Sequence, residues 1–224
     1  MALSFIFLII GQGVVHIRSS SFTLLRLGWL SEEDALAREL RKTVVRLETK
    51  CVNGYAQMQG TGFNVDQSGI IITNRHLLEN AASVLIAFPG GSSYEITDWH
   101  ISTDVDLAVI ELNSSGLPVA ELASSVVVPG DEVIVIGHPL HLYWVIANGE
   151  VLRYRMNYGR RMPLLMIDVQ VYPGSSGSPV FNKEGKVVGV IFATLYGYDG
   201  KDIKGLALER SEVIELLQSI YAPD

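Results

Sequence analysis

Cysteine is almost absent from this sequence: Cys51 is the only one in 224 residues. An intramolecular disulfide is therefore excluded, and the folded state must be stabilised by packing. A single thiol can act as a nucleophile, but in an apolar chain it is more often a small core residue. We interpret Cys51 as structural.

Charged residues are also scarce, at 18% of the chain, and acids outnumber bases by 24 to 17. A chain with a net charge of −7 does not attract phosphates, so nucleic acid is excluded as an expected partner. The hydrophobic content of 48% suffices for one domain with a sizeable core and argues against disorder. We interpret the basic stretch between Arg153 and Arg161 as a solvated loop rather than a binding patch.

Residues 3–10 form an apolar run that is too short for a membrane-spanning helix, which needs about 20 such residues. The run resembles a signal-peptide core, yet it lacks a preceding Lys or Arg and a small-x-small cleavage site. Arg18 and Arg26, which follow it, argue against simple export. A leader, a weak anchor and a mis-assigned start stay open for residues 1–30. From the run we expect membrane association through residues 3–17 and an extracytoplasmic or membrane-associated location.

Helical periodicity is confined to the two ends of residues 31–224, which we interpret as one domain. Ser31, followed by three acidic residues, predicts the start of an N-terminal helix. Residues 212–221 predict an amphipathic C-terminal helix. Short β-branched runs separated by Gly, Pro, Asn and Asp turns occupy the region between, at residues 70–73, 82–88, 107–112, 132–136, 164–171 and 186–192. Without βαβ alternation, this pattern predicts an all-β barrel or sandwich.

The segment Pro-Gly-Ser-Ser-Gly-Ser-Pro at residues 173–179 is the strongest chemical signal. A serine nucleophile needs a tight turn that exposes its hydroxyl, with unpaired backbone N–H groups nearby to bind an oxyanion. Ser176 fits this role, and Gly174 can present its N–H without a side chain in the way. The N–H of Ser176 would be the second donor. A flexible Gly/Ser hairpin loop is the alternative, and the segment alone does not decide between the two.

A histidine and an aspartate precede this serine in the chain, each beside a strand run. His76 follows the run at residues 70–73, where it could also be a surface or capping residue. Asp106 precedes the run at residues 107–112, so its carboxylate should be half-buried and require a partner. An imidazole N–H is a suitable partner, because the pairing fixes the ring for base catalysis. Asp106 could instead be a turn residue, and Asp104 is a competing candidate.

Taken together, five ordered segments resemble the trypsin-like peptidases, in particular the protease domain of the HtrA/Do (DegP-like) group. These segments are residues 60–65, 72–76, 106–109, 129–133 and 174–179, within a resemblance that runs from about Val44 to Glu209. The resemblance implies two six-stranded antiparallel β-barrels of the chymotrypsin-like kind, with the active site in the cleft between them.

The resemblance also implies the roles of the site residues. His76 would be the base, Asp106 the orienting carboxylate and Ser176 the nucleophile, with the backbone N–H groups of Gly174 and Ser176 as oxyanion donors. The implied function is a serine endopeptidase that cleaves polypeptides through an acyl-enzyme, with neither metal nor cofactor.

Two other functional classes stay open: a catalytically inactive trypsin-like fold that binds proteins, and an unrelated β-barrel binding module. HtrA proteins usually carry a PDZ domain after the protease, and we expect none before the end of this sequence at Asp224. Neither an oligomeric state nor a physiological substrate can be read from the residues.

The resemblance places the primary specificity pocket between two segments. Its expected lining residues are Gln170, Val171, Tyr172, Pro173, Ile191, Phe192 and Ala193. All are apolar or neutral, and none is an acid that could receive Lys or Arg. Ile191 stands where glutamyl endopeptidases place a histidine, which disfavours glutamate. We therefore predict a preference for small or medium apolar side chains at the cleaved position.

Two serines depart from the pattern of related families. Ser178 stands where much of the HtrA family has glycine, and a residue as small as serine should preserve activity. Ser175 stands where digestive trypsins have an aspartate that receives the new N-terminus after zymogen cleavage. That route of activation is therefore not expected here.

Overall fold

The computed structural model describes residues 35–52, 57–155, 163–196 and 203–222, together with two short strands, β1 (Ile9–Ile10) and β2 (Gly13–Val14). The rest of the apolar segment at residues 1–30 lies outside the described residues, as do Ser31, Arg160 and Arg161. Within the described part of the chain, no helix is long and apolar enough to cross a membrane.

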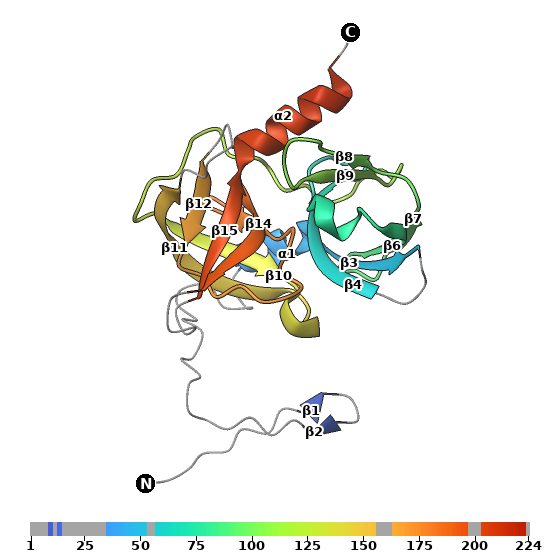
Figure 1. Ribbon diagram of the computed structural model, residues 1–224, viewed down its shortest axis with the longest axis horizontal. Helices are drawn as coiled ribbons and strands as arrows, with labels where there is room; N and C mark the ends of the chain where they lie inside the picture. The colour runs from blue at the N-terminus through green and yellow to red at the C-terminus, as the bar shows by residue number, and fades with distance from the viewer. Residues whose placement is uncertain are drawn as a thin grey trace.

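The first half of the described chain forms a seven-stranded antiparallel sheet with the order β7-β6-β3-β4-β5-β9-β8 (Figure 1). A 3₁₀ helix, η1 (Arg75–Leu77), follows β5. The edge strands β7 and β8 are short and largely solvent-facing. The seven strands are β3 (Val44–Cys51), β4 (Gln57–Asn64), β5 (Ile70–Thr73), β6 (Ala81–Ala87), β7 (Ser93–Ile96), β8 (His100–Ile101) and β9 (Ala108–Glu111).

The second half closes into a six-stranded antiparallel barrel in the order β10-β11-β12-β15-β14-β13, in which β13 pairs back with β10. A second 3₁₀ helix, η2 (Pro139–His141), follows β10. The barrel strands are β10 (Glu132–Gly137), β11 (Val145–Arg155), β12 (Leu164–Ile167), β13 (Pro179–Phe181), β14 (Val187–Tyr196) and β15 (Ile203–Glu209). The expected all-β architecture of two antiparallel units is thus confirmed, with seven strands in the first unit.

The pairing of β5 with β9 explains why His76 and Asp106 lie close together. Both strands are mostly buried, which matches their continuous Ile, Val and Ala runs. The antiparallel register places Thr73, the last residue of β5, opposite Ala108, the first residue of β9. His76 follows β5 by three residues and Asp106 precedes β9 by two. Both side chains are therefore placed at the same end of the two neighbouring strands.

An apolar core joins the sheet to the barrel. One buried cluster contains Phe63 and Ile72 from the sheet together with Ile134 and Phe181 from the barrel. Each fully buried side chain of this kind contributes about 1.5–3 kcal/mol relative to an exposed one. The two units therefore pack as one body and can contribute residues to a shared site.

Two helices complete the fold, as expected from the sequence. The N-terminal helix α1 (Ala35–Thr43) buries Ala37 and Leu40 against the shared core. The C-terminal helix α2 (Arg210–Tyr221) extends from the end of β15 (Figure 1) and is capped by Glu209, whose carboxylate accepts the Ser211 N–H at 3.0 Å. Cys51 ends β3 as a half-buried free thiol.

Candidate active site

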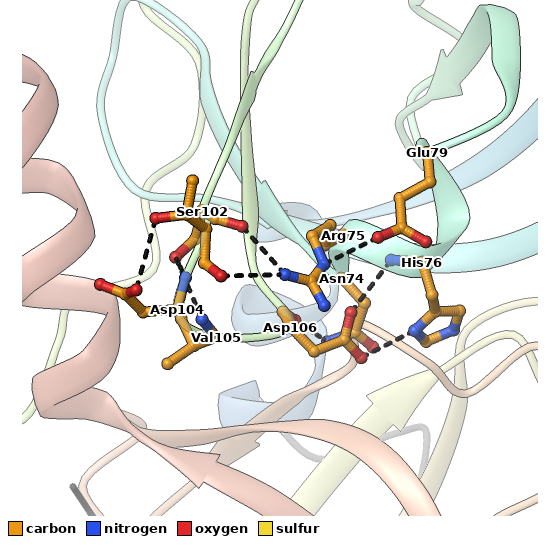
Figure 2. Close-up of polar contacts among 9 residues, drawn as sticks. Asn74, Arg75, His76, Glu79, Ser102, Asp104, Val105 and Asp106 are labelled. Carbon is orange, nitrogen blue, oxygen red and sulfur yellow. Dashed lines mark hydrogen bonds and ion pairs between the residues drawn. The ribbon is translucent and has the colours of Figure 1, made fainter. Parts of the chain in front are cut away.

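Asp106 contacts His76 at two points. Its Oδ2 lies 2.7 Å from Nδ1 of the imidazole, and its Oδ1 accepts the backbone N–H of His76 at 3.0 Å (Figure 2). The side-chain amide of Asn74 donates to the Asp106 carbonyl at 2.8 Å and fixes the backbone of the same residue. The carboxylate and the imidazole are thus held in one relative orientation.

This contact sets the tautomer of His76. An ionised carboxylate only accepts hydrogen bonds, so Nδ1 must carry the proton that it donates to Asp106. In the neutral ring Nε2 then keeps its lone pair and can accept a proton. The imidazole is therefore prepared to act as a base at the nitrogen that points away from Asp106.

Asp104, the competing candidate, does not contact the imidazole. Its carboxylate accepts a long hydrogen bond of 3.4 Å from the Thr103 hydroxyl, on the far side of the loop in Figure 2. The loop itself is tied to η1 by Arg75, which donates to the Ser102 carbonyl at 3.2 Å and pairs with Glu79 at 2.9 Å. The geometry thus favours Asp106 over Asp104 as the partner of His76.

The loop of the candidate nucleophile has two backbone N–H groups without an acceptor. Within it, Ser175, Gly177 and Ser178 donate their N–H groups to backbone carbonyls at 2.8–3.0 Å. Among the hydrogen bonds of the described residues, none uses the N–H of Gly174 or Ser176. These are the two donors that the sequence predicts for an oxyanion.

The carbonyls that precede these two N–H groups both accept a backbone hydrogen bond. The Pro173 carbonyl accepts the Leu140 N–H at 2.8 Å, and the Ser175 carbonyl accepts the Ser178 N–H at 3.0 Å. None of the described peptide bonds is cis. In a planar trans peptide the C=O and the N–H point in opposite directions, so fixing each carbonyl also fixes the N–H of the next residue.

Ser176 is the most accessible of the three serines in this loop, because Ser175 and Ser178 are buried. Its carbonyl accepts the N–H of Thr61 in β4 at 2.8 Å, which docks the loop of the barrel onto the sheet. Gly177 is required at this contact. Its φ of +84° favours glycine, and a Cβ there would overlap the carbonyl oxygen of Thr61.

His76 and Ser176 both flank the same short stretch of β4. On one side, a Cβ at Gly60 would collide with the side chain of Leu77, the residue after His76. On the other side, the backbone N–H of Thr61 donates a hydrogen bond to the Ser176 carbonyl. The hydrogen bonds of the described residues do not include one between the Ser176 hydroxyl and His76. Such catalytic bonds often tighten only when substrate binds.

The seven residues expected to line the specificity pocket fall into two groups. Val171 and Ile191 are buried in the core of the barrel, so their side chains are not accessible at the surface. The other five are exposed or half-buried, and the Tyr172 hydroxyl donates to the Gln170 side chain at 2.8 Å. The five are Gln170, Tyr172, Pro173, Phe192 and Ala193.

Two buried polar residues beside the nucleophile loop have no role assigned from the sequence, although Thr61 lies within the segment at residues 60–65. Thr61 and His138 are both fully buried and contact each other across 77 residues of sequence. In the sequence, each directly follows a glycine: Gly60 lies within β4, and Gly137 ends β10. Burial of the imidazole, with a smaller effect of the Arg46 charge, lowers the pKa of His138 to about 3.

This depressed pKa predicts a loss of stability in acid. In the unfolded chain His138 takes up a proton near pH 6.5, whereas in the folded protein it stays neutral down to about pH 3. The unfolded state therefore binds more protons between these values, and stability falls by up to about 1.4 kcal/mol for each pH unit below 6.5. Urea unfolding at pH 7, 6 and 5 measures this slope. We expect a shallower slope for His138→Asn, and equal slopes would contradict the assignment.

A family model described as a trypsin-like peptidase domain matches residues 60–190. Among curated proteins, a probable periplasmic serine endoprotease DegP-like from Chlamydia pneumoniae is 31% identical over 147 residues, covering 64% of this chain and 30% of that protein. The putative serine protease HhoB from Synechocystis sp. is 33% identical over 141 residues, covering 60% and 34%. The chain thus spans about a third of the length of these relatives.

Solved structures show the same fold. The HtrA-type protease AlgW with a tripeptide superposes with a TM-score of 0.73 at 21% identity, over 84% of this chain and 64% of that one. The Rv3671c protease from M. tuberculosis, in its active form, superposes with a TM-score of 0.72 at 22% identity, over 85% and 86%. These likenesses confirm the chymotrypsin-like fold that the resemblance implied.

Proposed function

Because this chain belongs to the trypsin-like peptidase family, we propose that it is a serine endopeptidase with Ser176 as nucleophile, His76 as general base and Asp106 as orienting carboxylate. The observation that carries the proposal is the two-point contact of Asp106 with His76, which leaves Nε2 of the ring free to take a proton. The names of the relatives, which include serine endoproteases, support the same reaction class.

The proposed reaction proceeds through an acyl-enzyme. The Ser176 oxygen attacks the carbonyl carbon of the peptide bond while Nε2 of His76 takes the hydroxyl proton. The tetrahedral intermediate collapses, the C–N bond breaks, and the imidazolium gives its proton to the departing amine. Water, deprotonated by the same imidazole, then attacks the ester and releases the second product and the free serine.

The oxyanion of each tetrahedral intermediate would accept the N–H groups of Gly174 and Ser176. Both donors are free of other acceptors among the described residues, and the carbonyls behind them are fixed. Fixed donors are effective because they need not reorganise as negative charge develops, and the loss of one typically costs about 10²–10³ in turnover. We expect this pair to supply the largest electrostatic contribution to the reaction.

We further propose that small or medium apolar side chains are preferred at the cleaved position. The accessible residues of the expected pocket are neutral, and the acid nearest in sequence, Asp168, forms an ion pair with Lys204 at 2.7 Å. A charged side chain would enter without a partner. In a peptide-library assay we therefore expect substrates with an apolar residue at the cleaved position to have a kcat/KM about 10-fold or more above that of substrates with Lys, Arg or Glu there. A profile dominated by any of those three would refute the preference.

Reaction with a fluorophosphonate tests the proposed nucleophile, because the reagent forms a covalent adduct with an activated serine. We expect mass spectrometry to find the adduct on Ser176 and not on Ser175 or Ser178, which are buried. Hydrolysis of casein by the same preparation tests the peptidase activity. A folded chain that neither reacts with the reagent nor cleaves casein would instead support the inactive, protein-binding alternative.

A further inference from the structure

We propose that Thr61 and His138 are positioning residues. They hold the backbone at Gly174 so that its N–H points toward the oxyanion. This inference rests on the proposed peptidase function. It concerns two fully buried polar side chains, one from the sheet and one from the barrel, that meet behind the nucleophile loop.

The Thr61 hydroxyl makes three contacts. It lies 2.9 Å from the Gly174 carbonyl oxygen, 3.1 Å from the His138 backbone nitrogen and 3.2 Å from Nδ1 of His138. A carbonyl can only accept, so the single hydroxyl proton goes to Gly174. The two lone pairs then accept the backbone N–H and the Nδ1–H of His138. Only this assignment satisfies all three contacts, and it makes His138 the Nδ1–H tautomer.

These contacts fix the backbone on both sides of the Gly174 N–H. Thr61 holds the Gly174 carbonyl, and the turn that begins at His138 brings the Leu140 N–H to the Pro173 carbonyl at 2.8 Å. Because Pro173 O and Gly174 N belong to one planar peptide, that bond sets the direction of the donor. The Thr61 backbone N–H also holds Ser176, so one residue of β4 contacts both proposed donor residues.

Gly174 needs such restraint. Its φ of +96° lies in the region that glycine adopts readily, and a glycine can leave it as readily. The space on the His138 side is filled, since a Cβ at Gly174 would overlap the His138 carbonyl oxygen. Oxyanion donors must be held close to their productive geometry, because small misplacements sharply reduce transition-state stabilisation.

Packing keeps the His138 ring where it is. The ring stacks edge-on against Trp144 with 4.9 Å between centroids, and the Trp144 indole N–H donates to the Val44 carbonyl at 2.8 Å. Next to it, the Arg46 guanidinium lies 4.7 Å from the centre of the Tyr143 ring. The imidazole of His138 is thus held between the start of β3 and the nucleophile loop.

Thr61→Val and Thr61→Ser form the matched pair for the test. Valine has the size of threonine without the hydroxyl, whereas serine keeps the hydroxyl. Rates are expressed per active site titrated with fluorophosphonate. We expect Thr61→Val to lower kcat by about 10- to 100-fold, with KM changed by less than about 3-fold. We expect the kcat of Thr61→Ser to stay within about 3-fold of wild type. An unchanged kcat for Thr61→Val would overturn the proposal, as would an equal loss in Thr61→Ser.

A second pair at His138 separates hydrogen bonding from packing. His138→Asn keeps an N–H donor near the place of Nδ1, while His138→Leu fills part of the ring volume without a donor. We expect the leucine variant to lose kcat as Thr61→Val does, and the asparagine variant to recover most of it. Equal losses in the two would show a packing role only and overturn the proposal. This pair decides the matter if Thr61→Val does not fold.

Crystal structures of the wild type and of Thr61→Val separate this proposal from the proposed function. A rotated Gly174 peptide in the variant supports positioning even if the wild type cleaves no peptide, a result that would refute only the peptidase assignment. A Gly174 peptide that keeps its orientation without the hydroxyl overturns the positioning role, whatever the activity of the wild type.

Discussion

Replacing Ser176 with alanine is expected to lower the turnover of casein by about 10⁶, to the level that binding and oxyanion donors alone can sustain. The other serines of the loop cannot substitute, because Ser175 and Ser178 are buried. The same substitution should abolish the fluorophosphonate adduct. Release of acid-soluble peptides from casein measures the loss.

Ser83→Ala is the matched control for this experiment. Ser83 is a half-buried serine of β6 whose hydroxyl donates to Glu95 at 3.0 Å, remote from the nucleophile loop in sequence. We expect this variant to cleave casein at the wild-type rate. Retention of more than about one-thousandth of the wild-type turnover in Ser176→Ala would show that another group is the nucleophile.

Replacing Asp106 with asparagine is expected to lower kcat by about 10⁴ while leaving the fold intact. The asparagine oxygen would keep the His76 backbone N–H that Oδ1 accepts at 3.0 Å. Its NH₂ group would then face Nδ1, which lies 2.7 Å from the carboxylate in the native protein. The ring would have to accept at Nδ1 and carry its proton on Nε2, where it could no longer take the proton of Ser176.

Asp104→Asn separates this effect from a general loss of negative charge. Asp104 lies two residues earlier in the same loop, and among the hydrogen bonds of the described residues its carboxylate accepts only that of the Thr103 hydroxyl. We expect its kcat to stay within about 2-fold of wild type, as for most surface substitutions away from a special contact. Equal losses in the two variants would mean that Asp106 acts through the field of the loop rather than through the tautomer of His76.

The parts of the site that follow from the sequence are those whose chemistry is local. The turn at residues 173–179 is specified by its own glycines and prolines, and the strands β5 and β9 are each marked by an apolar run. The assignment of Asp106 rather than Asp104 to His76 rested on the resemblance and on the position of Asp106 next to its run, whereas the pairing of the two strands is seen only in the structure. The C-terminal helix could also be predicted, because its apolar positions repeat with helical spacing.

The strands at the edge of the sheet have no such pattern. β7 (Ser-Tyr-Glu-Ile) alternates over only four residues and β8 (His-Ile) has only two, so neither is long enough to be recognised as a strand by its pattern. Their pairing depends on neighbours already in place. The seventh strand of the first unit was therefore beyond prediction from the residues alone.

The contact between Thr61 and His138 could not be predicted for a different reason. It joins Thr61 of β4 to the residue that follows β10, 77 residues later and in the other unit, and it exists only once the sheet and the barrel are packed. The turn after His138 also has left-handed φ angles at Leu140, His141 and Trp144. Bulky residues rarely adopt this conformation. Tertiary contacts, such as that of the Trp144 indole with Val44, hold them there.

The barrel that carries Ser176 closes only when β15 pairs with both β12 and β14, and β15 is the last of the described strands. A ribosome-bound chain from which His76, Asp106 and Ser176 have already emerged still lacks this strand. A nascent polypeptide that ends before residue 203 should therefore be inert, and enzymatic competence should arise in one step, when residues 203–209 leave the ribosome and close the barrel.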